Sequence, residues 1–159
     1  MTRVLGVDPG ATGAIALLDT VTGELVVADL PIIVVQKSGA RKTSEISESH
    51  LAQLIRAMTP DIAWVERVHA MPKQGVTSSF NFGVAYGIVR GIIGAVALPM
   101  LFVTPNEWKR EFRLGSDKAQ SRVLAGRLYP QSVSMFSRVR DDGRAEAALI
   151  ATFGARYPL

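Results

Sequence analysis

Four acidic side chains stand at positions from which a folded chain could bring carboxylates together. Asp8 and Glu66 each end a short apolar run. Asp142 and Glu146 are four residues apart in a stretch with helical character, so both lie on one helical face. Taken singly, Asp8 also suits a turn, Glu66 an ordinary strand end and Asp142 a helix N-cap. Together, the four residues point to a site.

A cluster of ionised carboxylates carries a large electrostatic cost. Two unit charges about 4 Å apart repel by about 4 kcal/mol at an effective dielectric constant of about 20. Either the pKa values of the carboxyl groups rise, or a divalent cation neutralises them. The sequence has no cysteine and only two histidines, so the ligands would be oxygen atoms, which favours Mg²⁺ or Mn²⁺. Such ions, held by carboxylates, support hydrolysis of phosphodiester bonds.

Basic residues are concentrated in the C-terminal half of the chain. The net charge is +4, but residues 1–36 carry one basic and four acidic side chains. Residues 104–144 carry nine basic and five acidic ones. A polyanion such as a nucleic acid would be attracted to this segment, although helices with solvated basic surfaces would give the same counts.

The length and composition indicate one globular domain spanning residues 1–159. With 48% hydrophobic and 20% charged side chains, a chain of this length can form a sizeable core. The absence of cysteine excludes disulfide frameworks, zinc-thiolate sites and a cysteine nucleophile. Because the sequence lacks the pattern of a signal peptide or a membrane span, we expect no membrane association and a cytoplasmic location.

Positioning these carboxylates requires a sheet and a terminal helix, and the hydrophobic periodicity predicts both. We expect strands over residues 4–8, 14–19, 24–30, 62–66 and 100–103. We expect helices from Ser47 or Ser49 to Pro60, then over residues 78–96, 105–112, 117–129 and 142–157. Loops are predicted over residues 31–43, 67–77 and 130–140. This order indicates an α/β fold with a mixed five-stranded sheet flanked by helices. If the strands that end at Asp8 and Glu66 are parallel neighbours, both carboxylates emerge at one edge.

The helix predicted over residues 78–96 carries two parallel rows with a spacing of four. The apolar row, which we expect to pack on the sheet, consists of Phe80, Val84, Ile88 and Ile92. The second row consists of Gly83, Gly87 and Gly91. Glycine costs up to about 1 kcal/mol at a helix position, so this row needs a reason. We expect it at or near a dimer interface, the alternative being close packing on the sheet or the last helix.

Two further helices have defined starts. Thr104, Pro105 and Glu107 match a capping box with proline in the first turn. Asp117 opens the next helix, whose buried side is predicted to consist of Val123, Leu124 and Leu128.

The acidic residues lie in motifs that resemble the RuvC family of Holliday junction resolvases. The matching runs are Gly6-Val7-Asp8-Pro9-Gly10-Ala11-Thr12-Gly13, Val65-Glu66 and Asp142-Gly143-Arg144-Ala145-Glu146-Ala147-Ala148-Leu149-Ile150-Ala151. The start of the last run is most similar to phage-encoded members. The resemblance implies an RNase H-like fold and a homodimer that uses a divalent metal to cut four-way DNA junctions. It also implies that Asp8, Glu66, Asp142 and Glu146 are the catalytic metal ligands.

The resemblance extends to residues that would contact DNA. Lys118 lies in a segment that resembles the family's basic segment near the scissile phosphate, and Lys109 is a second candidate of this kind. His69 stands where the family often carries an aromatic residue that probes the junction centre. Lys73 and Arg122 complete the expected DNA-binding set. For both lysines near the phosphate, an ordinary solvated position on a helix is the alternative.

Two points stay open at this stage. The bacterial pattern usually ends in two aspartates three apart, whereas Asp142 and Glu146 are four apart, so Asp141 could replace Asp142 as the ligand. A nuclease of this fold could instead act on RNA or on other branched DNA, or bind junctions without cutting them. Residues 8–13 also resemble the phosphate turn of sugar-kinase and actin-like ATPases, but those proteins need a second such domain.

Overall fold

A mixed five-stranded sheet forms the centre of the molecule, as predicted. The computed structural model describes residues 2–10, 12–36, 42–69 and 75–157. The strands of this sheet are β1 (Arg3–Asp8), β2 (Ala14–Asp19), β3 (Leu25–Asp29), β6 (Ile62–Glu66) and β7 (Met100–Val103). Their order is β3-β2-β1-β6-β7. The pairs β1–β2 and β2–β3 are antiparallel, whereas β1–β6 and β6–β7 are parallel.

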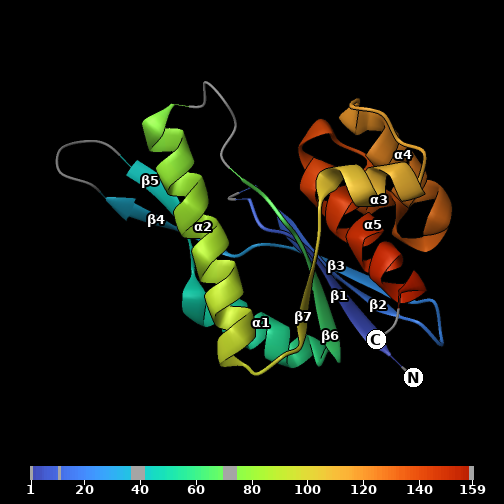
Figure 1. Cartoon of the computed structure of the whole chain (residues 1–159), viewed down its shortest axis with the longest axis horizontal. Coiled ribbons are helices and arrows are strands. Elements are labelled where there is room, and N and C mark those ends of the chain that lie inside the picture. The colour runs from blue at the N-terminus through green and yellow to red at the C-terminus, as the bar shows by residue number, and fades with distance from the viewer. Residues whose placement is uncertain (1, 11, 37–41, 70–74, 158–159) are drawn as a thin grey trace.

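Helices cover both faces of the sheet (Figure 1). They are α1 (Glu48–Met58), α2 (Val76–Ala95), α3 (Pro105–Glu111), α4 (Lys118–Leu128) and α5 (Asp142–Arg156). Leu5 and Val7 of β1 pack with α1 and α2 on one face, whereas Ala14 and Ala16 of β2 pack with α5 on the other. This division follows from the alternation of side chains along each strand. The predicted capping box of α3 is present, with Thr104 and Glu107 bonded reciprocally.

Helix α5 lies directly against β1 because small residues line the contact. A Cβ atom added to Gly6 would lie 2.2 Å from the backbone oxygen of Ala147 and 2.3 Å from the backbone nitrogen of Ala151. Further along the helix, a Cβ on Gly154 would lie 2.2 Å from the ring of Trp64. The first turn of α5, which carries the predicted acidic pair, is therefore held close to the end of β1.

Two predicted loops contain regular structure. Residues 31–43 were expected to form an exposed loop, but they contribute a hairpin of β4 (Ile32–Gln36) and β5 (Lys42–Ile46). The β-branched run Ile32-Ile33-Val34-Val35 explains β4, since such residues favour strands. Residues 130–140, also predicted as a loop, contain two 3₁₀ helices, η1 (Pro130–Phe136) and η2 (Val139–Asp141).

The predicted buried row of α2 is wrong at its N-terminal end. Phe80 is 70% exposed and Val84 39% exposed, while the buried residues of the helix are Ala85, Val89 and Ile93. At 3.6 residues per turn, a row with a spacing of four drifts around the helix by about 40° per step. The row therefore begins on the solvent side and reaches the core only near Ile88 and Ile92, which pack partly against it.

The glycine row lies on the same outer side of α2 as Phe80. Among the described residues, no heavy atom lies within 4 Å of a Cβ built on Gly83, Gly87 or Gly91. The alternative that these glycines accommodate the sheet or the last helix is therefore wrong.

Helix α4 also buries a different face from the one predicted. Its buried residues are Ser121 and Ala125, whereas Val123 is 52% and Leu128 41% exposed. Leu124 is partly buried, as expected. Ala125 packs with the alanines of α5, so close contact between small residues outweighs the burial of larger ones. In the part of the chain that the structure describes, no helix is long and apolar enough to cross a bilayer.

Candidate active site

Asp8 and Glu66 emerge side by side at one edge of the sheet. The parallel register pairs Val7 with Val65, so the next residues, Asp8 and Glu66, end adjacent strands in the same direction. Asp8 pairs with Ala14 across the turn, and its Oδ1 accepts a bond of 3.4 Å from the amide of Gly10. The predicted juxtaposition of these two strand ends is confirmed.

Helix α5 brings the second pair of carboxylates to this edge. Asp8, Asp142 and Glu146 line one cavity of about 530 Å³, together with Lys118 at the start of α4. Gly143 makes this approach possible, because a Cβ there would lie 2.9 Å from Asp8 Oδ2 and 2.7 Å from the backbone oxygen of Thr12. Glu66, which ends the strand next to that of Asp8, is 8% exposed and is not among the residues that line this cavity.

The carboxylates interact electrostatically. The pKa of Asp8 is raised from 3.8 to about 7, chiefly by burial and then by the charges of Glu146 and Glu66, against the opposing effects of the Gly10 amide and Lys118. Burial also raises the pKa of Glu66, and the charge of Glu146 adds to that shift. Such mutual perturbation is typical of carboxylates that share a site without enough compensating positive charge.

Neighbouring side chains hold three of the four carboxylates. Glu66 Oε1 accepts a bond of 2.8 Å from the indole nitrogen of Trp108, a fully buried residue of α3. Lys109 Nζ lies 3.6 Å from Glu146 Oε1, and Arg122 forms an ion pair with Asp142. Within the described residues, no three His, Cys, Asp or Glu side chains already form a group that could hold a metal ion. The lysine and the arginine would have to release their carboxylates for metal ligation.

The donor set nevertheless fits a hard divalent cation. Every candidate ligand is a carboxylate oxygen, and the raised pKa of Asp8 marks a place where added positive charge would be stabilising. The indole N–H on Glu66 corresponds to the outer hydrogen bonds that orient ligating carboxylates in metal sites. Asp8, Glu66, Asp142 and Glu146 could therefore hold Mg²⁺ or Mn²⁺.

The structure separates Asp141 from Asp142. Asp141 is 1% exposed and is bound by Arg138 and Arg144 on the side of β3, whereas Asp142 lines the acidic cavity. Their adjacent positions at the helix start turn the two side chains in different directions. This arrangement favours Asp142 over Asp141 as the candidate ligand.

The predicted DNA-binding residues differ in their surroundings. Lys118 is exposed and lines the acidic cavity, while Lys109 and Arg122 are engaged with Glu146 and Asp142. His69 is exposed, three residues beyond Glu66. Lys73 lies outside the described residues.

Several residues around the site were not predicted from the sequence. Trp108 is separated from Glu66 by 42 residues, so no spacing rule connects them. The sequence does place Trp108 in the first turns of a capped helix that directly follows a strand, and this position was the only local indication that it could lie near the site. Asp29, Arg138 and Arg144 were missed for the same reason, since their contacts join distant segments.

Comparison with known proteins identifies relatives of this chain. No protein-family model matches it. The crossover junction endodeoxyribonuclease RuvC of Nitratidesulfovibrio vulgaris is 31% identical over 125 residues, covering 76% of this chain and 72% of the relative.

Solved structures share the fold. Thermus thermophilus RuvC in complex with a Holliday junction substrate superposes with a TM-score of 0.60 at 15% identity, covering 98% of this chain and 96% of that one. The yeast mitochondrial Holliday junction resolvase Ydc2 gives 0.57 at 16% identity, covering 98% and 79%. The fowlpox virus resolvase bound to Holliday junction DNA gives 0.52 at 13% identity, covering 97% of each chain. These matches confirm the RNase H-like resolvase fold, and the sequence match shows that this chain belongs to the RuvC family of crossover junction endodeoxyribonucleases.

Proposed function

We propose that this chain, as one nuclease domain over residues 1–159, resolves four-way DNA junctions by hydrolysing a phosphodiester bond in each of two opposed strands. The observation that carries the proposal is the convergence of Asp8, Asp142 and Glu146 on one cavity beside Lys118, with Glu66 next to Asp8. The curated relative is named a crossover junction endodeoxyribonuclease, and the fold matches solved resolvases.

RuvC-family nucleases depend on a divalent metal ion, and we propose Mg²⁺ here, with Mn²⁺ as the alternative. Asp8, Glu66, Asp142 and Glu146 would hold it. Bound there, the ion would activate water and neutralise charge on the phosphate. Lys118 is exposed and lines the same cavity, where its charge would stabilise the negative charge that develops on the phosphate oxygens. Trp108 fixes one oxygen of Glu66 and leaves the other available.

Positive side chains near the cavity would hold the DNA backbone. Lys118 is exposed, and Lys109 and Arg122 would become available for phosphates once their carboxylates bind metal. We place His69 near the junction centre because it is exposed shortly after Glu66. Lys73 is proposed as a further contact on sequence grounds alone.

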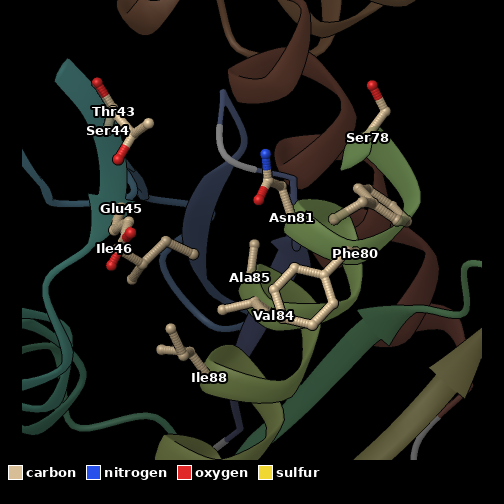
Figure 2. A pocket seen from close by; sticks show the side chains of 11 residues that line it. Thr43, Ser44, Glu45, Ile46, Ser78, Phe80, Asn81, Val84, Ala85 and Ile88 are labelled. Atoms are coloured by element: carbon tan, nitrogen blue, oxygen red, sulfur yellow. The ribbon is translucent and has the colours of Figure 1, made fainter. Parts of the chain in front are cut away.

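We propose that the active species is a homodimer joined through the outer face of α2, defined as Val76, Phe80, Gly83, Val84, Gly87 and Gly91. Phe80 is 70% and Val76 87% exposed, and the glycines have open space around them. A groove of about 400 Å³ between β5 and the same helix adjoins this surface, and polar side chains of β5 as well as Phe80 and Val84 line it (Figure 2). A two-fold dimer would match the two equivalent cleavage positions of a four-way junction.

The test is cleavage of a synthetic four-way junction, a linear duplex, another branched DNA and an RNA–DNA hybrid, each with and without Mg²⁺. We expect paired cuts in the junction only, and only with the metal ion. Faster cutting of the hybrid would support the alternative of an RNA-directed nuclease, and faster cutting of the other branch would support a broader branched-DNA nuclease. Tight junction binding without cutting under any metal would indicate a binding module. Asp8→Asn serves as the inactive control, since it removes a ligand and keeps the basic surface.

A further inference from the structure

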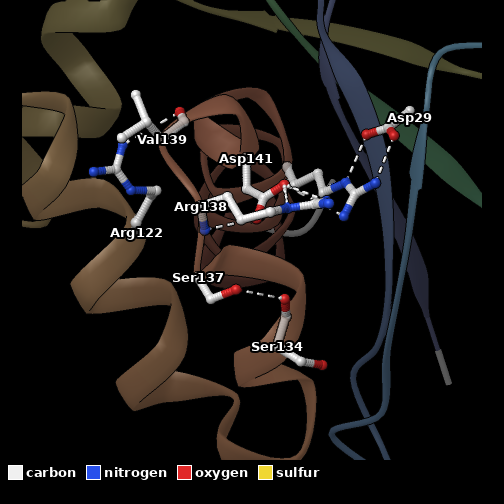
Figure 3. Close-up of polar contacts among 8 residues, drawn as sticks. Asp29, Arg122, Ser134, Ser137, Arg138, Val139 and Asp141 are labelled. Carbon is white, nitrogen blue, oxygen red and sulfur yellow. Dashed lines mark hydrogen bonds and ion pairs between the residues drawn. The ribbon is translucent and has the colours of Figure 1, made fainter.

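Four alternating charges connect the start of α5 to the edge of the sheet. Arg138 donates to Asp141 through Nε (3.2 Å) and Nη2 (2.8 Å). On the other side, Arg144 Nη1 lies 3.5 Å from Asp141 Oδ1. Arg144 also grips Asp29, at the end of β3, with bonds of 2.6 and 2.5 Å. Figure 3 shows Arg138 against Asp141, and Asp29 across from them at the sheet.

The buried member of this network has no capacity left for a metal ion. Asp141 is 1% exposed, and its Oδ2 also accepts a bond of 2.9 Å from the backbone amide of Arg138. A buried carboxylate is costly unless it is paired and hydrogen-bonded, and here both oxygens are satisfied by guanidinium and amide groups. Its chemistry is therefore that of a structural anchor.

The network acts on the turn that carries the candidate ligands. Arg144 lies in the first turn of α5, between Asp142 and Glu146 in sequence. Its guanidinium donates two hydrogen bonds to the carboxylate of Asp29 at the end of β3. On the other side of the same turn, Gly143 fits closely against the turn that follows Asp8. A rotation of this helical turn would move both ligands relative to Asp8.

We propose that Arg144, held between Asp29 and Asp141, is a positioning residue that sets the geometry of the Asp142–Glu146 pair for metal binding. This inference rests on the proposed function of the site. Groups hydrogen-bonded directly to metal ligands change metal affinity or activity by about 10- to 100-fold when they are altered, and we expect the lower end of that range here because Arg144 acts through the helical turn and not on a ligand itself. The bidentate hydrogen bonding to Asp29 requires a planar guanidinium, because a lysine ammonium is a point charge that cannot present two parallel N–H groups.

The decisive variant is Arg144→Lys, which keeps the net charge near the site and removes the fork. The matched control is Arg156→Lys, at the other end of the same helix. There Arg156 Nη1 lies 2.8 Å from Glu111 Oε1, and neither residue lines the acidic cavity. Asp29→Asn breaks the same contact from the more exposed partner. Because Asp29 also lines the acidic cavity, this variant removes a charge there as well, so Arg144→Lys decides where the two variants differ; Asp29→Glu restores a carboxylate. If Arg144→Lys fails to fold, these two variants still test the proposal.

The readouts are Mn²⁺ affinity of the DNA-free protein by electron paramagnetic resonance, and the Mg²⁺ dependence of single-turnover junction cleavage. We expect Arg144→Lys and Asp29→Asn to weaken Mn²⁺ binding about tenfold or more and to raise the half-saturating Mg²⁺ concentration in parallel. Asp29→Glu should recover most of the loss. Junction affinity measured without metal, and all properties of Arg156→Lys, should stay within about twofold of the wild type.

Three results would overturn the inference. Wild-type Mn²⁺ affinity in Arg144→Lys and Asp29→Asn would show that the grip does not set the ligands. Weaker junction binding with an unchanged metal response would make Arg144 a DNA contact. An equal loss in Arg156→Lys would reflect general loosening of α5. A wild-type protein that binds Mn²⁺ but cuts no junction would refute the proposed function separately.

Discussion

Neutralising Asp8 should stabilise the metal-free protein, and the sign follows from its raised pKa. The folded-state pKa of about 7 lies above the ordinary value of 3.8, so the folded protein binds this proton more tightly than the unfolded chain does. The wild-type free energy of unfolding should therefore fall as the pH rises from about 4 to about 7. Above that range the full penalty of the buried charge is present.

The size of the effect follows from the shift. From 3.8 to about 7 is roughly three pKa units, and each unit corresponds to about 1.4 kcal/mol, so the upper bound is about 4 kcal/mol at pH 8. For a chain of this length, each kcal/mol corresponds to about 2–4 °C in Tm. Asp8→Asn removes the charge with little change of shape, so it should abolish most of this pH dependence. Mg²⁺ at a hundredfold excess over its Kd should stabilise the wild type by about 2.7 kcal/mol and the variant by much less.

The assay is urea unfolding of wild type and Asp8→Asn between pH 4 and 8, in EDTA and again with Mg²⁺. The two stability curves should meet near pH 4 and diverge as the pH rises, with the variant the more stable in EDTA. Added Mg²⁺ should narrow the gap or reverse it. Parallel curves across this pH range, together with an equal response to Mg²⁺, would show that Asp8 does not lie in an uncompensated carboxylate cluster.

Three further predictions concern single side chains. Trp108→Phe removes the N–H bonded to Glu66 and keeps an aromatic ring. It should raise the half-saturating Mg²⁺ concentration about tenfold in cleavage assays and leave junction affinity unchanged. An unchanged Mg²⁺ dependence would mean that this hydrogen bond does not orient Glu66. Lys118→Ala should lower the single-turnover rate more than the affinity, and the reverse pattern in paired binding and rate measurements would make it an ordinary backbone contact. Gly87→Leu should fold, with its helix stabilised by about 0.5–1 kcal/mol, yet sediment as a monomer and lose paired cutting; a folded dimer of normal activity would place the interface elsewhere.

The parts of the site that could be predicted from sequence are those that local rules determine. Asp8 and Glu66 follow apolar runs, and strands of a parallel pair end at the same edge, so their proximity follows once the two strands are neighbours. The spacing of Asp142 and Glu146 gives a shared helical face in the same way. The cap of α3 was equally local, because Thr104 and Glu107 satisfy each other within one turn.

The parts that could not be predicted depend on contacts between distant segments. Asp29 and Arg144 are 115 residues apart, and nothing in either local sequence indicates that they meet. The buried face of α4 was misjudged because helix contacts at short range favour Ala125 over the larger Val123. The choice between Asp141 and Asp142 depends on which side chain is buried between Arg138 and Arg144 and which one lines the acidic cavity, and that is a property of the tertiary structure.

The closeness of α5 to β1 connects the core of this protein to its chemistry. Side chains at a packing contact set how closely a helix can approach its neighbour, as they do between two helices. Here Gly6 offers no side chain, and the backbone of Ala147 occupies the space that a Cβ would need. Ala147 follows Glu146 directly, so any group added at Gly6 would displace a candidate ligand as well as the helix. The position of the carboxylates is thus determined by the packing of small residues in the core, and a substitution there would impair metal binding even in a protein that remains folded.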